Sequence, residues 1–214
     1  MRPSLLTHFL LSLAILLCLS SVEAAELKSS INRYKGTVVS EETLDQLEPY
    51  NKYINYFSQF TFFRRNHKVS PDFIRALIIA ESNVDPRAVS SKNAMGLGQI
   101  IYTTGQEAAR ELARSRFTFK YVDKKKLAAL QKEDLFDPAT NILLTCYLIS
   151  KYNYKFNGRL ELVLSAWNAG ENHKALSDGQ PVPYAETMNL IGKINGYYIS
   201  LLQKKKHISI YARP

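Results

Sequence analysis

The spacing of apolar residues constrains the fold of this chain more than any other feature of its sequence. Along most of the chain, apolar side chains recur every three or four residues, which is the period of a helix with one buried face. The clearest sets are Phe73, Ile74, Leu77 and Ile78, and Leu160, Val163, Leu164 and Trp167. No segment alternates apolar and polar residues for long. We therefore predict an all-α fold.

Helix start and stop signals divide the chain into successive elements. Ser70-Pro71 and Asp137-Pro138 each combine a capping side chain with proline at the first helical position, and Gly170 is a stop signal. The expected helices cover about 40–48, 70–84, 106–115, 137–153, 160–169 and 185–205. Residues 87–103 are expected to form a structured loop, 116–133 are ambiguous, and 25–39 read as an extended arm. An aromatic stripe is assigned to the core: Tyr53, Phe57, Phe60 and Phe63.

The first 24 residues have the layout of a secretory signal peptide. Arg2 supplies a positive charge, Phe9 to Leu19 is almost entirely apolar, and Val22-Glu23-Ala24 resembles a small-residue cleavage site. The apolar run is well short of the roughly 20 residues that span a bilayer. We predict cleavage after Ala24 and a periplasmic or secreted protein. An uncleaved signal that anchors the chain in the membrane is the alternative.

Cleavage would leave a single cysteine, because Cys18 departs with the signal and Cys146 remains. No intramolecular disulfide is then possible, so a hydrophobic core must supply the stability. Cys146 lies on an apolar helix face and is expected to be a small buried hydrophobe. We assign residues 25–48 to an N-terminal extension, 49–205 to one domain and 206–214 to a C-terminal tail.

The net charge is +9, from 28 basic and 19 acidic residues. The charges are spread along the chain, and the runs at 124–126 and 204–206 are typical of solvated helix faces or tails. We expect no nucleic-acid partner; an acidic cell-wall polymer or an anionic membrane surface is the alternative reading of the charge. The four histidines are scattered. The sequence therefore indicates no metal and no cofactor.

Glu81 is the residue that most suggests chemistry. It follows Leu77 by four residues and Ile78 by three, so it continues an apolar helix face. A carboxylate in this position should be partly desolvated, which raises its pKa toward that of a general acid working near neutral pH. The alternative is a capping or salt-bridged glutamate at the helix end.

Four motifs, in order, resemble the soluble lytic transglycosylases, the goose-lysozyme-like enzymes of the cell wall. They are Glu81-Ser82 with Ala94 to Ile100, Asp134 to Ile142, Ser165 to Gly170, and Pro183 to Thr187. The resemblance covers about residues 50–200. It implies a lysozyme-like helical domain with a glycan-binding groove.

The resemblance also implies an activity and its residues. The activity is cleavage of the β-1,4 bond between N-acetylmuramic acid and N-acetylglucosamine in peptidoglycan, with 1,6-anhydromuramoyl ends and Glu81 as the single acid/base. The implied substrate-binding residues are Ser82, Gly96, Gln99, Trp167, Asn168 and Tyr184. The implied partners are peptidoglycan strands and, in a specialised role, the envelope machinery of secretion or conjugation.

Several departures from the family pattern bear on this reading. Trp167 stands where the family usually has tyrosine, and Tyr102 stands where it usually has proline. Gly98 stands where the family often has methionine, which is expected to remove a side chain from the groove. Leu190 stands where the family has a tyrosine near the acid, and Tyr184, Tyr197 or Tyr198 are candidates to supply the missing phenol. The alternatives to a transglycosylase are a hydrolytic muramidase and a catalytically weak peptidoglycan-binding or scaffold protein.

Overall fold

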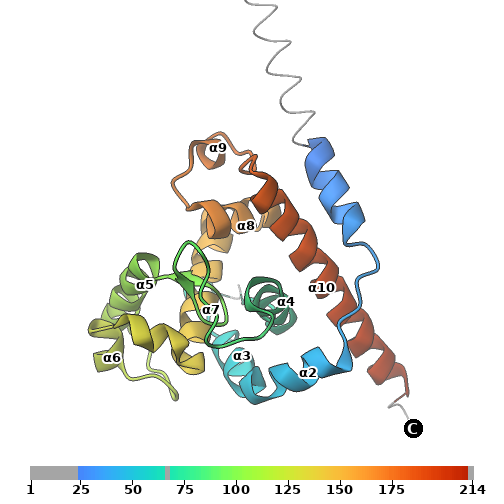
Figure 1. Cartoon of the computed structure of the whole chain (residues 1–214). Coiled ribbons are helices and arrows are strands. Elements are labelled where there is room, and N and C mark those ends of the chain that lie inside the picture. The colour runs from blue at the N-terminus through green and yellow to red at the C-terminus, as the bar shows by residue number, and fades with distance from the viewer. Residues whose placement is uncertain (1–23, 66–67, 212–214) are drawn as a thin grey trace, which may run out of the picture.

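The computed structural model describes residues 24–65 and 68–211, and within them it confirms the all-α prediction (Figure 1). The helices are α2 (Glu41–Leu47), η1 (Glu48–Tyr50), α3 (Asn51–Phe57), α4 (Pro71–Ser82), α5 (Tyr102–Arg114), α6 (Lys124–Ala128), η2 (Lys132–Phe136), α7 (Pro138–Lys155), α8 (Leu160–Ala169), α9 (Lys174–Ser177) and α10 (Ala185–Tyr211). A further helix covers 24–33. Two short strands, β1 (Ala94–Met95) and β2 (Ile100–Ile101), pair as an antiparallel hairpin. The predicted signal peptide lies almost wholly outside the described residues.

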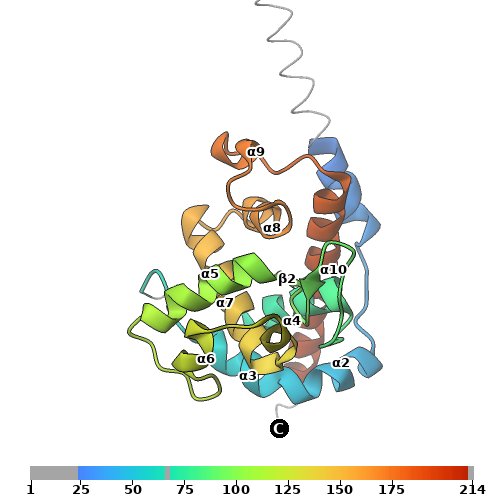
Figure 2. The same cartoon turned by 60° about the vertical axis from the view of Figure 1, so that its left-hand side comes forward.

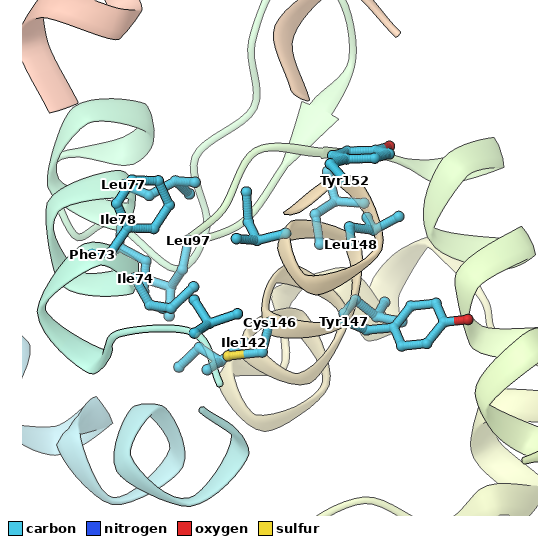
Figure 3. Packing of buried hydrophobic residues seen from close by; sticks show 14 of the residues in the cluster. Phe73, Ile74, Leu77, Ile78, Leu97, Ile142, Cys146, Tyr147, Leu148 and Tyr152 are labelled. Carbon is cyan, nitrogen blue, oxygen red and sulfur yellow. The ribbon is translucent and has the colours of Figure 1, made fainter. Parts of the chain in front are cut away.

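The interior is built around α4 and α7. Both begin as the sequence predicts: the Ser70 side chain accepts from the Phe73 amide, the Asp137 side chain accepts from the Ala139 amide, and a proline follows each cap. Most residues of α4 are buried, so this helix has apolar contacts on nearly every side. Figure 3 shows α4 side chains facing those of α7, with Leu97 between the two helices and Cys146 buried on α7, as predicted.

The helix α10 covers another side of α4. The 27-residue α10 runs along α4 and also packs against α8 (Figures 1 and 2). Gly170 ends α8 as predicted, with a positive φ of 88°. This arrangement gathers the C-terminal ends of α4 and α8 near the N-terminal part of α10.

The N-terminal segment differs from the extended arm that was predicted. Residues 24–33 form a helix that lies beside α10 (Figure 1). Gly192 and Gly196 permit the close approach, since a Cβ on either would lie 2.7 Å from the backbone of Ser30 or Tyr34. Further along, the Val39 amide donates to Ser200 Oγ at 2.9 Å, and Val39 is buried. The predicted extension therefore contributes to the same core as the rest of the domain.

Several predicted boundaries need correction. The helix expected from 106 starts at Tyr102, and the expected loop at 87–103 contains the β1–β2 hairpin. The last helix runs to Tyr211, so most of the predicted tail 206–214 is helical. Of the aromatic stripe, Phe57 is fully buried whereas Phe63 is 36% exposed, so the stripe is core only in part.

Within the described residues, no helix is both long enough and apolar enough to cross a membrane.

Candidate active site

Glu81 lies in the last turn of α4, where the backbone turns sharply. Asn83 has a φ of 51° and ends the helix in the left-handed conformation, and Val84 follows with a φ of 68°. A β-branched residue at positive φ is strained, and such strain is found mainly at sites whose surroundings enforce it. The turn sends the chain away from α4 directly after Ser82. It leaves Glu81 facing the neighbouring helices.

The carboxylate of Glu81 accepts a hydrogen bond from the indole of Trp167, with 2.7 Å between Nε1 and Oε1. Burial raises the pKa of Glu81 to about 7, as its place on the apolar face predicted. The Trp167 hydrogen bond and the charge of Lys193 act in the opposite direction, whereas the charge of Glu186 raises the pKa further. At neutral pH both the acid and the carboxylate of Glu81 are therefore populated.

Side-chain bonds tie α4, α8 and α10 together around Glu81. Trp167 connects α8 to α4 through Glu81 itself. Asn168 Nδ2 donates to Thr187 Oγ1 at 2.7 Å and connects α8 to α10, so Asn168 is more than a helix cap. Lys193 Nζ donates to the carbonyl oxygen of Ala80 at 2.7 Å and connects α10 back to α4. The acid thus lies within a closed ring of inter-helix contacts.

The β1–β2 hairpin carries two more of the predicted residues. Gly96 is buried with a φ of 71°, and Gln99 has a φ of 51°. Gln99 Nε2 donates to the carbonyl oxygens of Ala88 and Gly96 at 3.1 and 2.9 Å. The N–H₂ group of Gln99 therefore stabilises the loop, and its carbonyl oxygen is the atom left for a ligand.

Asn141 anchors this hairpin to α7. Its Oδ1 accepts from the Gly98 amide at 2.8 Å, and its Nδ2 donates to the carbonyls of Met95 and Leu135 at 3.0 and 2.8 Å. Asn141 is only 1% exposed. The position of the hairpin thus depends on the buried side-chain amide of Asn141, whose oxygen accepts and whose nitrogen donates hydrogen bonds.

The expectation that Gly98 removes a groove-lining side chain is wrong. A Cβ on Gly98 would collide with the buried hydroxyl of Thr145 and lie 3.2 Å from Asn141 Oδ1. The Cα of Gly98 therefore faces α7 and the interior. Glycine is required here by close packing of the hairpin on α7.

Ser82 and Tyr184 form their bonds away from the carboxylate. Ser82 Oγ donates to the Ile78 carbonyl of its own helix at 3.1 Å. Tyr184 is 52% exposed, and its hydroxyl lies 3.1 Å from His173 Nε2. Each hydroxyl keeps lone pairs that can accept from a ligand.

Leu190 is buried in the core, and among the described residues none of the candidates Tyr184, Tyr197 and Tyr198 hydrogen-bonds Glu81. Tyr184 is bonded to His173, and the ring of Tyr198 packs edge-on against Phe73. Among the described residues, the indole of Trp167 is the side chain that hydrogen-bonds the Glu81 carboxylate.

Sequence reasoning missed Lys193 and Asn141 as residues that shape the site. A sequence signal exists for each. Lys193 immediately precedes the core residue Ile194 on an inward-facing stretch of α10, and Asn141 stands one position before buried Ile142. A cation or an amide beside core positions indicates a specific partner, because burying it unpaired is costly.

A helical domain with a half-buried glutamate at the junction of α4, α8 and α10 is the arrangement of lysozyme-like proteins. The family model described as the transglycosylase SLT domain matches residues 60–181, more than half of the chain. The chain belongs to this family, as the sequence motifs predicted. The model covers a slightly shorter span than the 50–200 of the resemblance.

Known proteins show how far the similarity extends. A Haemophilus influenzae protein, assigned by name to the soluble lytic murein transglycosylases, is 28% identical over 76% of this chain. The 70 kDa soluble lytic transglycosylase of Escherichia coli superposes with a TM-score of 0.52 at 19% identity, over 69% of this chain. The lytic transglycosylase Slt of Pseudomonas aeruginosa gives 0.50 at 18% identity, over 77%. These two structures show a shared fold.

The chain spans only part of each of these relatives. It matches 27% of the Haemophilus protein and 24% of each of the two crystallised enzymes.

Proposed function

We propose that this protein is a peptidoglycan lytic transglycosylase that uses Glu81 as its single acid/base. The observation that carries the proposal is the environment of Glu81: it lies half-buried at the junction of three helices, its pKa is raised to about 7, and one of its oxygens accepts a hydrogen bond from Trp167. A group with this pKa can give a proton and take one back at neutral pH.

The proposed reaction balances with one carboxyl group. Protonated Glu81 donates to the glycosidic oxygen as the bond from that oxygen to C1 of N-acetylmuramic acid breaks. The C6 hydroxyl of the same sugar then attacks C1, and its proton returns to Glu81. The C1–O6 bond that forms gives the 1,6-anhydro end, no water is consumed, and Glu81 recovers its starting state.

The surroundings of Glu186 support a scheme with one protein acid. The two-carboxylate glycosidase schemes need a second acid at a defined position beside the bond. Glu186 is the acid whose charge reaches Glu81, but its side chain is 61% exposed and pairs with Lys92 at 2.5 Å. This ion pair connects α10 to the loop that precedes β1.

The relatives support the proposed class of enzyme, though not its individual residues. The proteins named above are lytic transglycosylases by name, and the Pseudomonas structure is that of an inactive variant in which one glutamate is replaced by glutamine. Glycan strands of peptidoglycan are the substrate that we propose for this chain, with Ser82, Gln99, Asn168 and Tyr184 as contacts. Export to the periplasm or beyond, and work beside a secretion or conjugation machine, remain predictions from the sequence.

The direct test compares three forms of the chain without residues 1–24 on purified peptidoglycan. They are the wild type, Glu81→Gln, and Glu42→Gln, a matched control in which the substituted glutamate is exposed on α2. Mass spectrometry of the released fragments should show anhydro ends from the wild type and the control and no release by Glu81→Gln. Fragments with reducing ends would make the protein a muramidase. Sedimentation of all three forms with the wall, without any release, would favour a binding protein.

A further inference from the structure

Trp167 is the only tryptophan in the chain, and its indole contacts the proposed acid directly. It stands on α8 where the family has a tyrosine. The ring is half-buried against the core, at the end of α8 that faces α4. Its Nε1 lies 2.7 Å from Glu81 Oε1, across a sequence separation of 86 residues.

The chemistry of the indole makes this contact directional. An indole N–H donates a hydrogen bond and has no lone pair to accept one, whereas a tyrosine hydroxyl does both. Oε1 of Glu81 must therefore act as the acceptor in both ionisation states. When Glu81 is protonated, the proton is left to Oε2.

The other polar groups around Glu81 do not duplicate this contact. Lys193 Nζ donates to the carbonyl of Ala80, and Glu186 pairs with Lys92. Their charges act on Glu81 from α10 with opposite signs. Leu190 is apolar and buried, so it contributes no hydroxyl.

We propose that Trp167 is the positioning residue of the acid: its N–H fixes Oε1 as acceptor and directs the transferable proton to Oε2. This inference rests on the proposed role of Glu81. It assigns to one residue of α8 the task left open by the loss of the phenol at Leu190. A tyrosine hydroxyl can exchange a proton with the acid, whereas the indole N–H of Trp167 donates a hydrogen bond and does not titrate.

The first test needs no substrate, because the single tryptophan reports its own environment. In a pH titration of the wild type, the fluorescence of Trp167 and its one indole N–H signal in a ¹H–¹⁵N spectrum should change with a midpoint near the pKa of Glu81, about 7. In Glu81→Gln this transition should vanish. A flat titration in the wild type, or the same transition in Glu81→Gln, would overturn the contact whether or not the protein cleaves peptidoglycan.

The second test measures the consequence for catalysis. Trp167→Phe keeps a ring and removes the N–H, so the acid loses a hydrogen bond that favours its ionised form. We expect kcat to fall roughly 10-fold with KM nearly unchanged, since charge-assisted hydrogen bonds have about that effect. The pH–rate profile should also shift upward, because this bond lowers the pKa of Glu81.

Two further variants separate the loss of the indole N–H from other effects of substitution. Tyr154→Phe removes a hydroxyl from a half-exposed ring elsewhere and should leave kcat and the pH profile unchanged. Trp167→Tyr restores a donor of the family type and should recover part of kcat. A folded Trp167→Phe with wild-type kcat and pH profile would refute the positioning role. If the wild type cleaves nothing, the proposed function fails, and the spectroscopic titration still decides whether the contact exists.

Discussion

Replacing Asn141 should weaken the attachment of the β1–β2 hairpin, which carries Gly96 and Gln99, to α7. In Asn141→Ala the Gly98 amide and the carbonyls of Met95 and Leu135 lose their partner inside the core. An unsatisfied buried polar group costs about 1–3 kcal/mol. Water that enters the space left by the amide would recover part of this cost. We therefore expect a loss of about 3–5 kcal/mol in the free energy of unfolding.

This loss is large against the roughly 5–15 kcal/mol of a typical domain. It should lower the midpoint of thermal unfolding by about 10 °C, given about 2–4 °C per kcal/mol for chains of this length. Circular dichroism measures the midpoint, and urea titration measures the free energy. Asn32→Ala, at an exposed helical position, is the matched control and should change little.

Asn141→Asp sharpens the test. The aspartate keeps an acceptor for the Gly98 amide but places negative charge against two carbonyl oxygens. Burial and this repulsion raise its pKa in the folded state above the unfolded value, so its contribution to stability falls as pH rises. The deficit relative to wild type should be greater at pH 7 than at pH 5. A cost below about 1 kcal/mol for Asn141→Ala would refute the anchoring role.

Further expectations concern the acid and α10. The folded pKa of Glu81 is about 7 against an ordinary value of 4.5, so the contribution of Glu81 to wild-type stability should fall as pH rises from about 4.5 to about 7. Glu81→Gln should be more stable than wild type by about 2–3 kcal/mol at pH 8 and by little at pH 4, measured by urea unfolding. Equal stability at both pH values would argue against the raised pKa. Gly192→Ala should destabilise the chain by about 1 kcal/mol although alanine favours helices, since its Cβ meets Ser30; a gain in thermal midpoint would contradict the packing of helix 24–33 on α10. Lys193→Met removes a cation that lowers the pKa of Glu81, so the Trp167 fluorescence transition should move to higher pH, and an unchanged midpoint would exclude that influence.

Interactions between residues close in the sequence made most of the helices, and the position of Glu81, predictable. Ser40, Ser70 and Asp137 cap the helices that follow them, because each side chain reaches an amide two or three residues ahead. The partial burial of Glu81 also follows from local spacing, since residues three and four apart share a helix face.

The rest depended on contacts between distant parts of the chain. The partner of Glu81 is 86 residues away, and nothing in the local sequence of α8 identifies that contact. The helix at 24–33 has no clear apolar period of its own, and it is stabilised by close packing on Gly192 and Gly196. The inward orientation of Gly98 is set by its neighbours Gly96 and Gln99, both at positive φ. These features depend on tertiary contacts, which the local pattern of residue types does not predict.

The source of the oxygen at the cleaved C1 tests the central claim most directly. Purified peptidoglycan would be digested by the wild type in ¹⁸O-labelled water, with Glu81→Gln beside it, and the new fragment ends analysed by mass spectrometry. Attack by the C6 hydroxyl predicts unlabelled anhydro ends from the wild type and no new ends from Glu81→Gln. Reducing ends that carry ¹⁸O, or anhydro ends produced equally by Glu81→Gln, would contradict the account.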